Sequence, residues 1–314
     1  MKIGIIGPGA MGCLLAGKLA LAGNEVILLD HNPERAEFIN QKGLKIKGDK
    51  GPYPVKIATT LNPQDLGDRE LIINCVKAYD TKAVAKTLIP IGKGPYFLTL
   101  QNGVGSVNIL GEILPKDKIL AGITSHGATY LGYGRVRYAG QGDTFIGFGF
   151  PGIGRDQEET TRPETFASIL TGAGFQTRTV DQVDNLLWSK LLVNVGINAL
   201  TALTRLQNGA LLQFPGTLEI MEEAVREGIR VGEKKGIKFI YEDMQAQVKK
   251  VCRLTAGNVS SMLQDVLKKK RTEIDFINGV IMETGRAYKI PVPVNSTLTR
   301  LIKTVEAGYD QTMQ

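Results

Sequence analysis

The chain has 314 residues, a length that suits two domains of roughly 150 residues each. Its composition, 43% hydrophobic and 22% charged with three cysteines and two histidines, is that of a globular protein and argues against disorder, a disulfide scaffold, a structural zinc site or any other bound metal. The net charge of +7 favours anionic ligands without identifying one, and the few cysteines suit a reducing, cytoplasmic location.

Short β-rich runs alternate with helical patterns through the first half of the chain, as in parallel βαβ units. We predict strands at residues 2–6, 25–29, 71–76, 96–100, 119–124, 134–139, 143–148 and 175–180. An α/β Rossmann-type N-terminal domain is therefore expected over residues 1–181.

A glycine-rich turn follows the first predicted strand. Gly7-Pro8-Gly9-Ala10-Met11-Gly12 fits the pattern G-x-G-x-x-G, whose glycines allow a tight turn, close approach of a pyrophosphate to the backbone and close packing of helix on strand. The helix that opens there and runs to Leu21 directs its unpaired N–H groups at the phosphates. Because these glycines would break the apolar helix of a signal peptide, we interpret the segment as a dinucleotide site.

An acidic residue, Asp30, ends the second predicted strand. A carboxylate at this position can accept hydrogen bonds from the adenosine ribose and repel a 2′-phosphate, which favours NAD over NADP. His31, Arg35 and the positive net charge favour NADP if the Asp30 carboxylate turns away. The residues themselves leave the choice of cofactor open.

Two polar residues follow predicted strands at the carboxyl edge of the sheet, where open α/β folds bind their ligands. Lys77 can contact a phosphate or a ribose there, and Asn102 can contact the nicotinamide side. Each is equally consistent with an ordinary loop residue.

Long amphipathic patterns replace strands after residue 181, at 182–203, 217–236, 242–254 and 257–288, and a short helix follows at 294–307. We therefore predict an all-α C-terminal domain over residues 182–314. We expect no stretch after the N-terminus to be long and apolar enough to cross a bilayer, and therefore no membrane association. The basic run at 268–271 lacks aromatic neighbours and a DNA-binding motif, so we interpret it as a solvent-exposed helix face and expect no nucleic-acid partner.

Three polar residues, Lys190, Asn194 and Asn198, recur at every fourth position of an otherwise apolar helical segment. Such residues drift only about 40° per step around a helix, so all three share one face. Buried polar groups need partners or a ligand, so this stripe is either a catalytic face or a polar seam between the domains. A second polar set, Asn258 and Ser261 with Glu273 beyond them, meets Lys190 only if the tertiary fold brings it there.

Several motifs occur together along the chain: the opening GPGAMG and residues 75–78, 101–103, 124–128, 190–198, 208–209, 258–265 and 272–279. With them the sequence resembles the ketopantoate reductases (2-dehydropantoate 2-reductases), within the 6-phosphogluconate dehydrogenase-like superfamily. The resemblance spans nearly the whole chain. It is specific, because SSMLQD followed by TEIDFINGV is not generic Rossmann sequence.

The resemblance implies reduction of 2-dehydropantoate, a small 2-oxo acid, to (R)-pantoate, a step toward pantothenate and coenzyme A. It implies that Lys190 is the general acid and that Glu273 holds the lysine and the substrate hydroxyl in place. Substrate binding is implied for Asn102, Asn194, Asn198, Asn258 and Ser261, and cofactor binding for Asn102, Lys77 and the backbone at Ala128. A lysine suits this chemistry, since hydride delivery to a ketone builds negative charge on oxygen and needs a positioned proton donor.

NADP is the cofactor that the resemblance implies. However, Asp30 and His31 stand where NADP-dependent members commonly carry an arginine, so NAD stays open. Two alternative functions are a paralogous reductase of another 2-oxo acid and a non-catalytic redox sensor that binds NAD(P). Lys190 with Glu273 argues against the sensor, which needs no proton donor. Apolar helical faces in the second domain are compatible with a homodimer.

Overall fold

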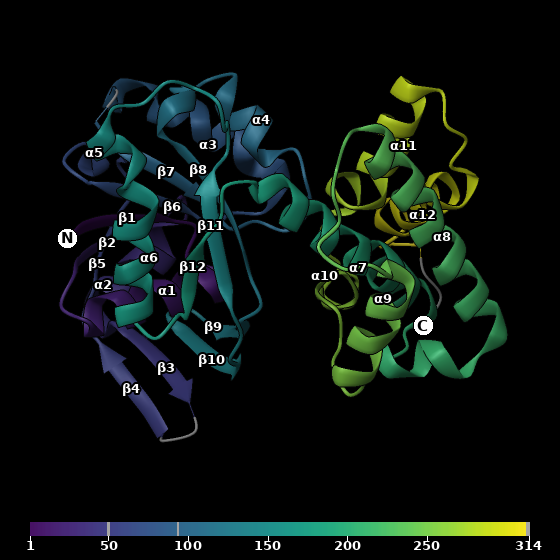
Figure 1. Ribbon diagram of the computed structural model, residues 1–314. Helices are drawn as coiled ribbons and strands as arrows, with labels where there is room; N and C mark the ends of the chain where they lie inside the picture. Colours follow the sequence, from purple (N-terminus) through teal and green to yellow (C-terminus); the bar gives the residue numbers. More distant parts are fainter. Residues whose placement is uncertain (49–50, 93, 312–314) are drawn as a thin grey trace. The chain divides into compact units, whose positions relative to one another are not determined.

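The computed structural model describes residues 1–48, 51–92 and 94–311, and the chain forms two compact units (Figure 1). The first unit comprises Met1–Gln101 and Ser106–Val183, and the second comprises Asn102–Gly105 and Asp184–Gln314. The second unit thus includes a short loop from the first half of the sequence. The division into a cofactor domain at 1–181 and a substrate domain at 182–314 stays a prediction.

A mostly parallel sheet of eight strands runs through the first unit in the order β12-β11-β8-β7-β6-β1-β2-β5. Its strands are β1 (Lys2–Ile6), β2 (Glu25–Leu29), β5 (Ala58–Thr60), β6 (Leu71–Asn74), β7 (Tyr96–Thr99), β8 (Ile119–Thr124), β11 (Thr144–Phe148) and β12 (Thr177–Thr179). β8 and β11 pair antiparallel, and the other neighbours pair parallel. The predicted Rossmann-type α/β domain is confirmed.

Helices cover both faces of this sheet. They are α1 (Ala10–Leu21), α2 (Pro33–Lys42), α3 (Thr81–Leu88), α4 (Ser106–Gly111), α5 (Gln157–Thr160) and α6 (Arg162–Gly172), with 3₁₀ turns at Pro63–Leu66, Ala78–Asp80, Ile89–Ile91 and Lys116–Lys118. Ile3 and Ile5 pack in one core with residues of α1 and α6, whereas Ile6 packs in another core with residues of α3 and α4. Because both faces are covered, β6, β7 and β8 bury every residue and read as continuous apolar runs.

A second sheet, in the order β4-β3-β10-β9, packs against α1. It contains β3 (Leu44–Gly48), β4 (Gly51–Val55), β9 (Gly127–Gly132) and β10 (Arg135–Gly140). The sequence predicted β10 but missed the other three strands, as it missed β5. Buried and exposed residues alternate along β3, which is the pattern of a strand with one solvent-exposed face. The two prolines of β4 argue against a strand, and they are tolerated because β4 is at the edge of its sheet.

The second unit is all helical, as predicted. Its helices are α7 (Val183–Thr204), α8 (Pro215–Lys234), α9 (Met244–Leu254), α10 (Ser261–Leu267), α11 (Asn278–Tyr288) and α12 (Pro293–Ala307), with 3₁₀ turns at Asn208–Gln213 and Ile274–Phe276. Leu192, Val195 and Ala199 of α7 are fully buried in a single core with residues of α8, α9 and α11. The polar residues of α7 therefore lie on a helix at the centre of a packed bundle.

α7 corrects the expectation that no later stretch is long and apolar enough to cross a bilayer. Its 22 residues meet that criterion by length and composition. However, 78% of its apolar window is buried inside the structure. Packing in the core of the second unit therefore accounts for the apolar composition of α7.

The single helix predicted over residues 257–288 is wrong. α10 ends at Leu267, and the next residues form a turn in which Lys269 has a φ of 51°. The N–H groups of Lys268 and Lys270 both donate to the carbonyl of Asp265. Four consecutive charged residues supply no apolar side chain to continue the buried face, so the chain leaves the helix there. The basic run is exposed, as predicted, but it lies on a turn.

Candidate active site

The glycine turn after β1 has the geometry needed to hold a pyrophosphate. Gly7 has a φ of +91°, which favours glycine. A Cβ on Gly12 would lie 2.1 Å from the carbonyl oxygen of Gly7, so only glycine permits this close approach. A Cβ on Gly9 would meet nothing within 4 Å, so the turn is open beside the N-terminus of α1, whose first N–H groups have no partners within the helix. These residues fit a bound dinucleotide.

Asp30 does not present its carboxylate to solvent at the end of β2. The side chain is fully buried and accepts hydrogen bonds from the N–H groups of His31 and Asn32, at 2.7 and 3.0 Å, and from Nε and Nη2 of Arg35, at 2.6 and 2.5 Å. Burial acts to raise the pKa of Asp30, but these hydrogen bonds outweigh it and hold the pKa below its ordinary value. The Asp30 carboxylate is therefore paired within the protein, and its contact with a cofactor stays a prediction.

His31 differs from Asp30 in exposure. The His31 side chain is 92% exposed, whereas the Asp30 side chain is fully buried and that of Arg35 is 18% exposed. The imidazole is thus accessible to a ligand from solvent, with its Nδ1 3.9 Å from Oδ1 of Asp30, while the guanidinium is held in place by Asp30.

One glutamine ties the carboxyl ends of β6 and β7 together. Oε1 of Gln101 accepts hydrogen bonds from Asn74 and Thr99, at 3.1 and 2.9 Å, and its Nε2 donates to the carbonyl of Val76 at 2.8 Å. Gln101 was not predicted to be a site residue. The available signal was its place directly after a predicted strand and next to Asn102.

The remaining predicted cofactor residues lie in two parts of the first unit. Lys77 follows β6, is half-buried and precedes the 3₁₀ turn Ala78–Asp80. Ala128 lies in β9, opposite Tyr138 of β10, and packs against the core that contains α1. Their contacts with a cofactor stay a prediction.

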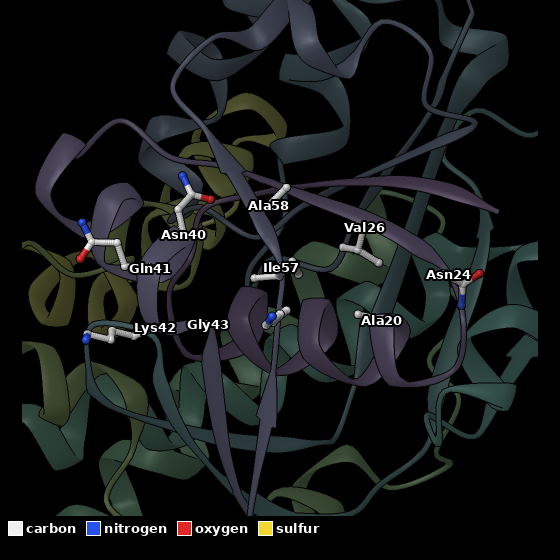
Figure 2. Close-up of a pocket in the computed structure, with 10 residues that line it drawn as sticks. Ala20, Asn24, Val26, Asn40, Gln41, Lys42, Gly43, Ile57 and Ala58 are labelled. Atoms are coloured by element: carbon white, nitrogen blue, oxygen red, sulfur yellow. The ribbon is translucent and has the colours of Figure 1, made fainter.

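A surface groove of about 640 Å³ lies at the other end of α1 from the glycine turn (Figure 2). Two asparagines that line it bond within the protein: the Asn40 side chain bonds the N–H and the carbonyl of Thr59, both at 2.8 Å, and Asn24 donates to the carbonyl of Leu19. Because the 12 residues of α1 rise about 18 Å, this groove is not part of the dinucleotide site.

The polar stripe of α7 lies on one helix, as its spacing predicts. Asn198 is 5% exposed. Nδ2 of Asn194 is buried and has no hydrogen-bond partner among the described residues. An unpaired buried amide costs about 1 to 3 kcal/mol, so Asn194 is a donor that a ligand can satisfy.

Lys190 and Glu273 are brought together by the fold of the second unit. Burial lowers the pKa of Lys190 from 10.5 to about 8, and the negative charge of Glu273 partly opposes this shift. Glu273 is itself buried, with 6% exposure. A lysine with a pKa near 8 is still protonated at neutral pH but gives up its proton more readily than an ordinary lysine, which is the property of a general acid.

Asn102 belongs to the second unit although it follows β7 of the first. The N–H of Val104 donates to the carbonyl of Phe276 at 3.1 Å. Gly103 has a φ of +82°, and a Cβ there would lie 2.2 Å from the same carbonyl oxygen. Only glycine lets the loop dock this closely, and the docking places Asn102 in the same unit as Glu273.

Asn258 and Ser261 lie on either side of the residue that caps α10. That residue, Ser260, accepts a hydrogen bond from the N–H of Leu263 at 3.1 Å, and its Oγ lies 2.7 Å from the hydroxyl of Thr201 in α7. Asn258 and Ser261 are exposed. The cap thus links α10 to the helix with the polar stripe and leaves both neighbouring side chains open to a ligand.

The cysteines and acidic residues supply no competing chemistry. Within residues 1–48, 51–92 and 94–311, no cluster of three or more His, Cys, Asp or Glu side chains is suited to a metal ion. Burial raises the pKa of Cys13 and of Cys75 to about 12, so neither thiol is a nucleophile at neutral pH.

Protein-family comparisons match both halves of the chain. The family model described as "Ketopantoate reductase PanE/ApbA" matches residues 3–149, and "Ketopantoate reductase PanE/ApbA C terminal" matches residues 182–306. The chain belongs to the ketopantoate reductase family. The resemblance found in the sequence is thereby confirmed.

Relatives within the ketopantoate reductase family align over almost their full lengths. The 2-dehydropantoate 2-reductase of Halobacterium salinarum is 36% identical over 304 residues, which cover 96% of this chain and 98% of that protein. The 2-dehydropantoate 2-reductase of Vibrio cholerae is 31% identical over 312 residues, which cover 99% of this chain and all of that protein.

Solved structures extend the ketopantoate reductase match to the fold. A family member from Ralstonia eutropha superposes with a TM-score of 0.90 at 32% identity, covering 99% of this chain and 100% of that chain. D-mandelate dehydrogenase, solved with NADH and anilino(oxo)acetate, superposes with a TM-score of 0.91 at 26% identity and the same coverage.

Proposed function

We propose that this protein reduces 2-dehydropantoate to (R)-pantoate with a nicotinamide cofactor. Family membership over both halves of the chain and full-length relatives named for this reaction support the proposal. The observation that carries it is Lys190, a lysine in the polar stripe of α7, with a pKa lowered to about 8 and the charge of Glu273 acting on it.

Lys190 has the role of the proton donor. The cofactor, when bound, supplies the hydride that adds to the ketone carbon. As the C=O π electrons move onto the oxygen, Nζ of Lys190 gives that oxygen a proton, and the ketone becomes a hydroxyl. The lysine is left as a neutral amine, which solvent then reprotonates. The lowered pKa makes this transfer easier than from an ordinary lysine.

Glu273 has two roles in the proposal. Its negative charge opposes the effect of burial on Lys190, so the lysine stays protonated at neutral pH. Its carboxylate also accepts a hydrogen bond from a substrate hydroxyl. The unpaired amide of Asn194 donates to the substrate, and the remaining polar groups of the proposed substrate site are Asn102, Asn198, Asn258 and Ser261.

We also propose NADP(H) as the preferred cofactor. The Asp30 carboxylate is buried against Arg35, so it adds no exposed negative charge where a 2′-phosphate would lie, and His31 beside it is exposed. The residues proposed to hold the cofactor are those of the glycine turn, Gly7, Pro8, Gly9, Ala10, Met11 and Gly12, together with His31, Lys77, Asn102 and the backbone at Ala128.

A steady-state assay of 2-dehydropantoate reduction with NADPH and NADH side by side tests substrate and cofactor together. We expect turnover with both, and a kcat/KM at least about tenfold greater with NADPH, the effect of about 1.4 kcal/mol of differential binding. Lys190→Ala should keep NADPH binding and lower turnover by about 10² to 10⁴ fold. Absence of turnover with either cofactor would refute the reaction, and a preference for NADH would refute the choice of cofactor.

Reduction of a different 2-oxo acid is the second candidate function. It is favoured by the similarity to D-mandelate dehydrogenase, which acts on a 2-hydroxy acid with an aromatic side chain. A panel of 2-dehydropantoate, phenylglyoxylate and branched aliphatic 2-oxo acids distinguishes the two candidates. Turnover of another member of the panel with no reduction of 2-dehydropantoate would establish the second.

A further inference from the structure

The segment from Glu273 to Asn278 connects several parts of the second unit. Glu273 lies at its start and acts on Lys190 of α7. The Phe276 carbonyl accepts the hydrogen bond from Val104, next to the loop that carries Asn102. At the end of the segment, Nδ2 of Asn278 donates to the carbonyl of Val195 in α7 at 3.3 Å. The segment is therefore fixed to two of the elements that carry proposed site residues.

Backbone hydrogen bonds make this segment a continuous unit. The N–H of Phe276 donates to the carbonyl of Glu273 at 3.0 Å, and the N–H of Ile277 donates to that of Ile274 at 3.2 Å. Asn278 then begins α11. The bonded turns thus connect Glu273 to Ile277, the residue directly before Asn278.

Asn278 is fully buried, and a second asparagine holds its amide in place. Besides the bond to Val195, Nδ2 of Asn278 donates to Oδ1 of Asn295 at 2.9 Å. Asn295 is also fully buried, and its Nδ2 donates to the Ala224 carbonyl at 2.9 Å. The pair joins α11 and α12 to α7 and α8.

A buried carboxylate anchors this arrangement. Glu227, fully buried in α8, accepts hydrogen bonds from the N–H groups of Val294 and Asn295, at 2.8 and 2.9 Å, and from Nδ2 of Asn295 at 2.7 Å. Burying a carboxylate is costly unless such bonds satisfy it. Glu227 thus holds the first N–H groups of α12 and the side chain of Asn295 in one position. This fixes the position of Oδ1 of Asn295, which accepts the hydrogen bond from Asn278.

We propose that Asn278 is a positioning residue that sets the placement of Glu273 relative to Lys190, and that Asn295 and Glu227 hold it there. This inference rests on the proposed function, which makes Lys190 the proton donor and Glu273 its partner. Val195 is one residue from Asn194 on α7, so the bond from Asn278 also fixes the register between the segment and the polar stripe. A site of this kind loses about 10² fold in rate when its groups move by about 1 Å.

The test compares Asn278→Ala with a matched control, Thr299→Val. Thr299 is buried on α12, one turn beyond Asn295, and its hydroxyl donates within its own helix, to the carbonyl of Asn295. Glu227→Gln is the second variant, which keeps the side-chain shape but replaces one acceptor oxygen with a donor. Each purified protein is assayed for kcat and for KM of both substrates, and for the pKa of Lys190 by NMR titration of lysines labelled with ¹³C at Cε.

We expect Asn278→Ala to lower kcat by about 10 to 100 fold with the KM for NADPH changed by less than about twofold. Because Glu273 would move away, the pKa of Lys190 should fall below its wild-type value. Glu227→Gln should lower kcat and the pKa of Lys190 by smaller amounts. If Asn278→Ala does not fold, Glu227→Gln alone provides the test. Thr299→Val should leave kcat and the Lys190 titration unchanged.

The NMR titration needs no substrate, so it separates the two proposals. If wild type does not reduce 2-dehydropantoate, the proposed function fails, and a lowered Lys190 pKa in Asn278→Ala still supports the positioning role. An unchanged Lys190 titration in both variants overturns the positioning role, even where kcat has fallen. Equal losses of kcat in Asn278→Ala and Thr299→Val would overturn it as well.

Discussion

The alkaline limb of the pH profile follows directly from the pKa of Lys190. An amine loses its proton as the pH rises, so a general-acid lysine is active below its pKa and inactive above it. With a pKa of about 8, Lys190 is about 90% protonated at pH 7, about 10% at pH 9 and about 1% at pH 10. The kcat/KM for 2-dehydropantoate should therefore fall about tenfold from pH 7 to 9 and about tenfold again by pH 10.

An ordinary lysine gives a different curve. With a pKa of 10.5 it would lose only about 3% of its protonated form by pH 9 and about a quarter by pH 10. The assay is initial-rate oxidation of NADPH between pH 6.5 and 10 at saturating cofactor, with Lys190→Ala as the control that should lack this limb. Glu273→Gln removes the charge that raises the Lys190 pKa and should move the limb to lower pH. A profile that stays flat to pH 9.5, or the same limb in Lys190→Ala, would refute the reasoning.

Three further substitutions test the cofactor and substrate parts of the site. Gly12→Ala puts a Cβ 2.1 Å from the Gly7 carbonyl oxygen and should abolish NADPH binding in a fluorescence titration, whereas retained affinity would show that the turn adapts. Gly103→Ala puts a Cβ 2.2 Å from the Phe276 carbonyl oxygen, so it should displace Asn102 and lower kcat at least about tenfold; wild-type kcat would contradict this. Asp30→Ala leaves Arg35 without its carboxylate and should lower the free energy of unfolding in urea by about 1.5 to 3 kcal/mol, and an unchanged midpoint would mean that the pair contributes nothing.

The strands of the main sheet are predictable because the strands of a parallel sheet covered on both faces are continuous apolar runs in the sequence. β6, β7 and β8 are short apolar runs with every residue buried. The sequence pattern of the second sheet is weaker. β3 alternates lysine with apolar residues over only five positions, and β4 contains two prolines. The break after α10 is missed although the sequence carries a signal for it, the four consecutive charged residues at 268–271, because helical patterns occur on both sides of that run.

The candidate site divides in the same way between local and tertiary information. Helical spacing alone predicts that Lys190, Asn194 and Asn198 share a face, because that is a property of one helix. The hydrogen-bond partners of Asp30 are not predictable from its position in the sequence. The end of the strand places the carboxylate, but the rotamer of Arg35 determines whether the guanidinium donates to it. Whether Asp30 contacts a cofactor therefore depends on a side-chain pairing within the following helix.

The meeting of Lys190 with Glu273 is the least predictable part, and it is the part on which the proposed chemistry depends. Burial alone would leave Lys190 a poorly charged amine, and the charge of Glu273 keeps its pKa near 8. Glu273 is placed by a segment whose end is fixed through Asn278 to helices far apart in sequence. Because Glu227 holds the partner of Asn278 through N–H groups of α12, we expect the proposed proton donor to be tuned by a residue with no direct part in the reaction. A substitution in this buried network should therefore change the pH dependence of turnover while the polar stripe on α7 stays intact.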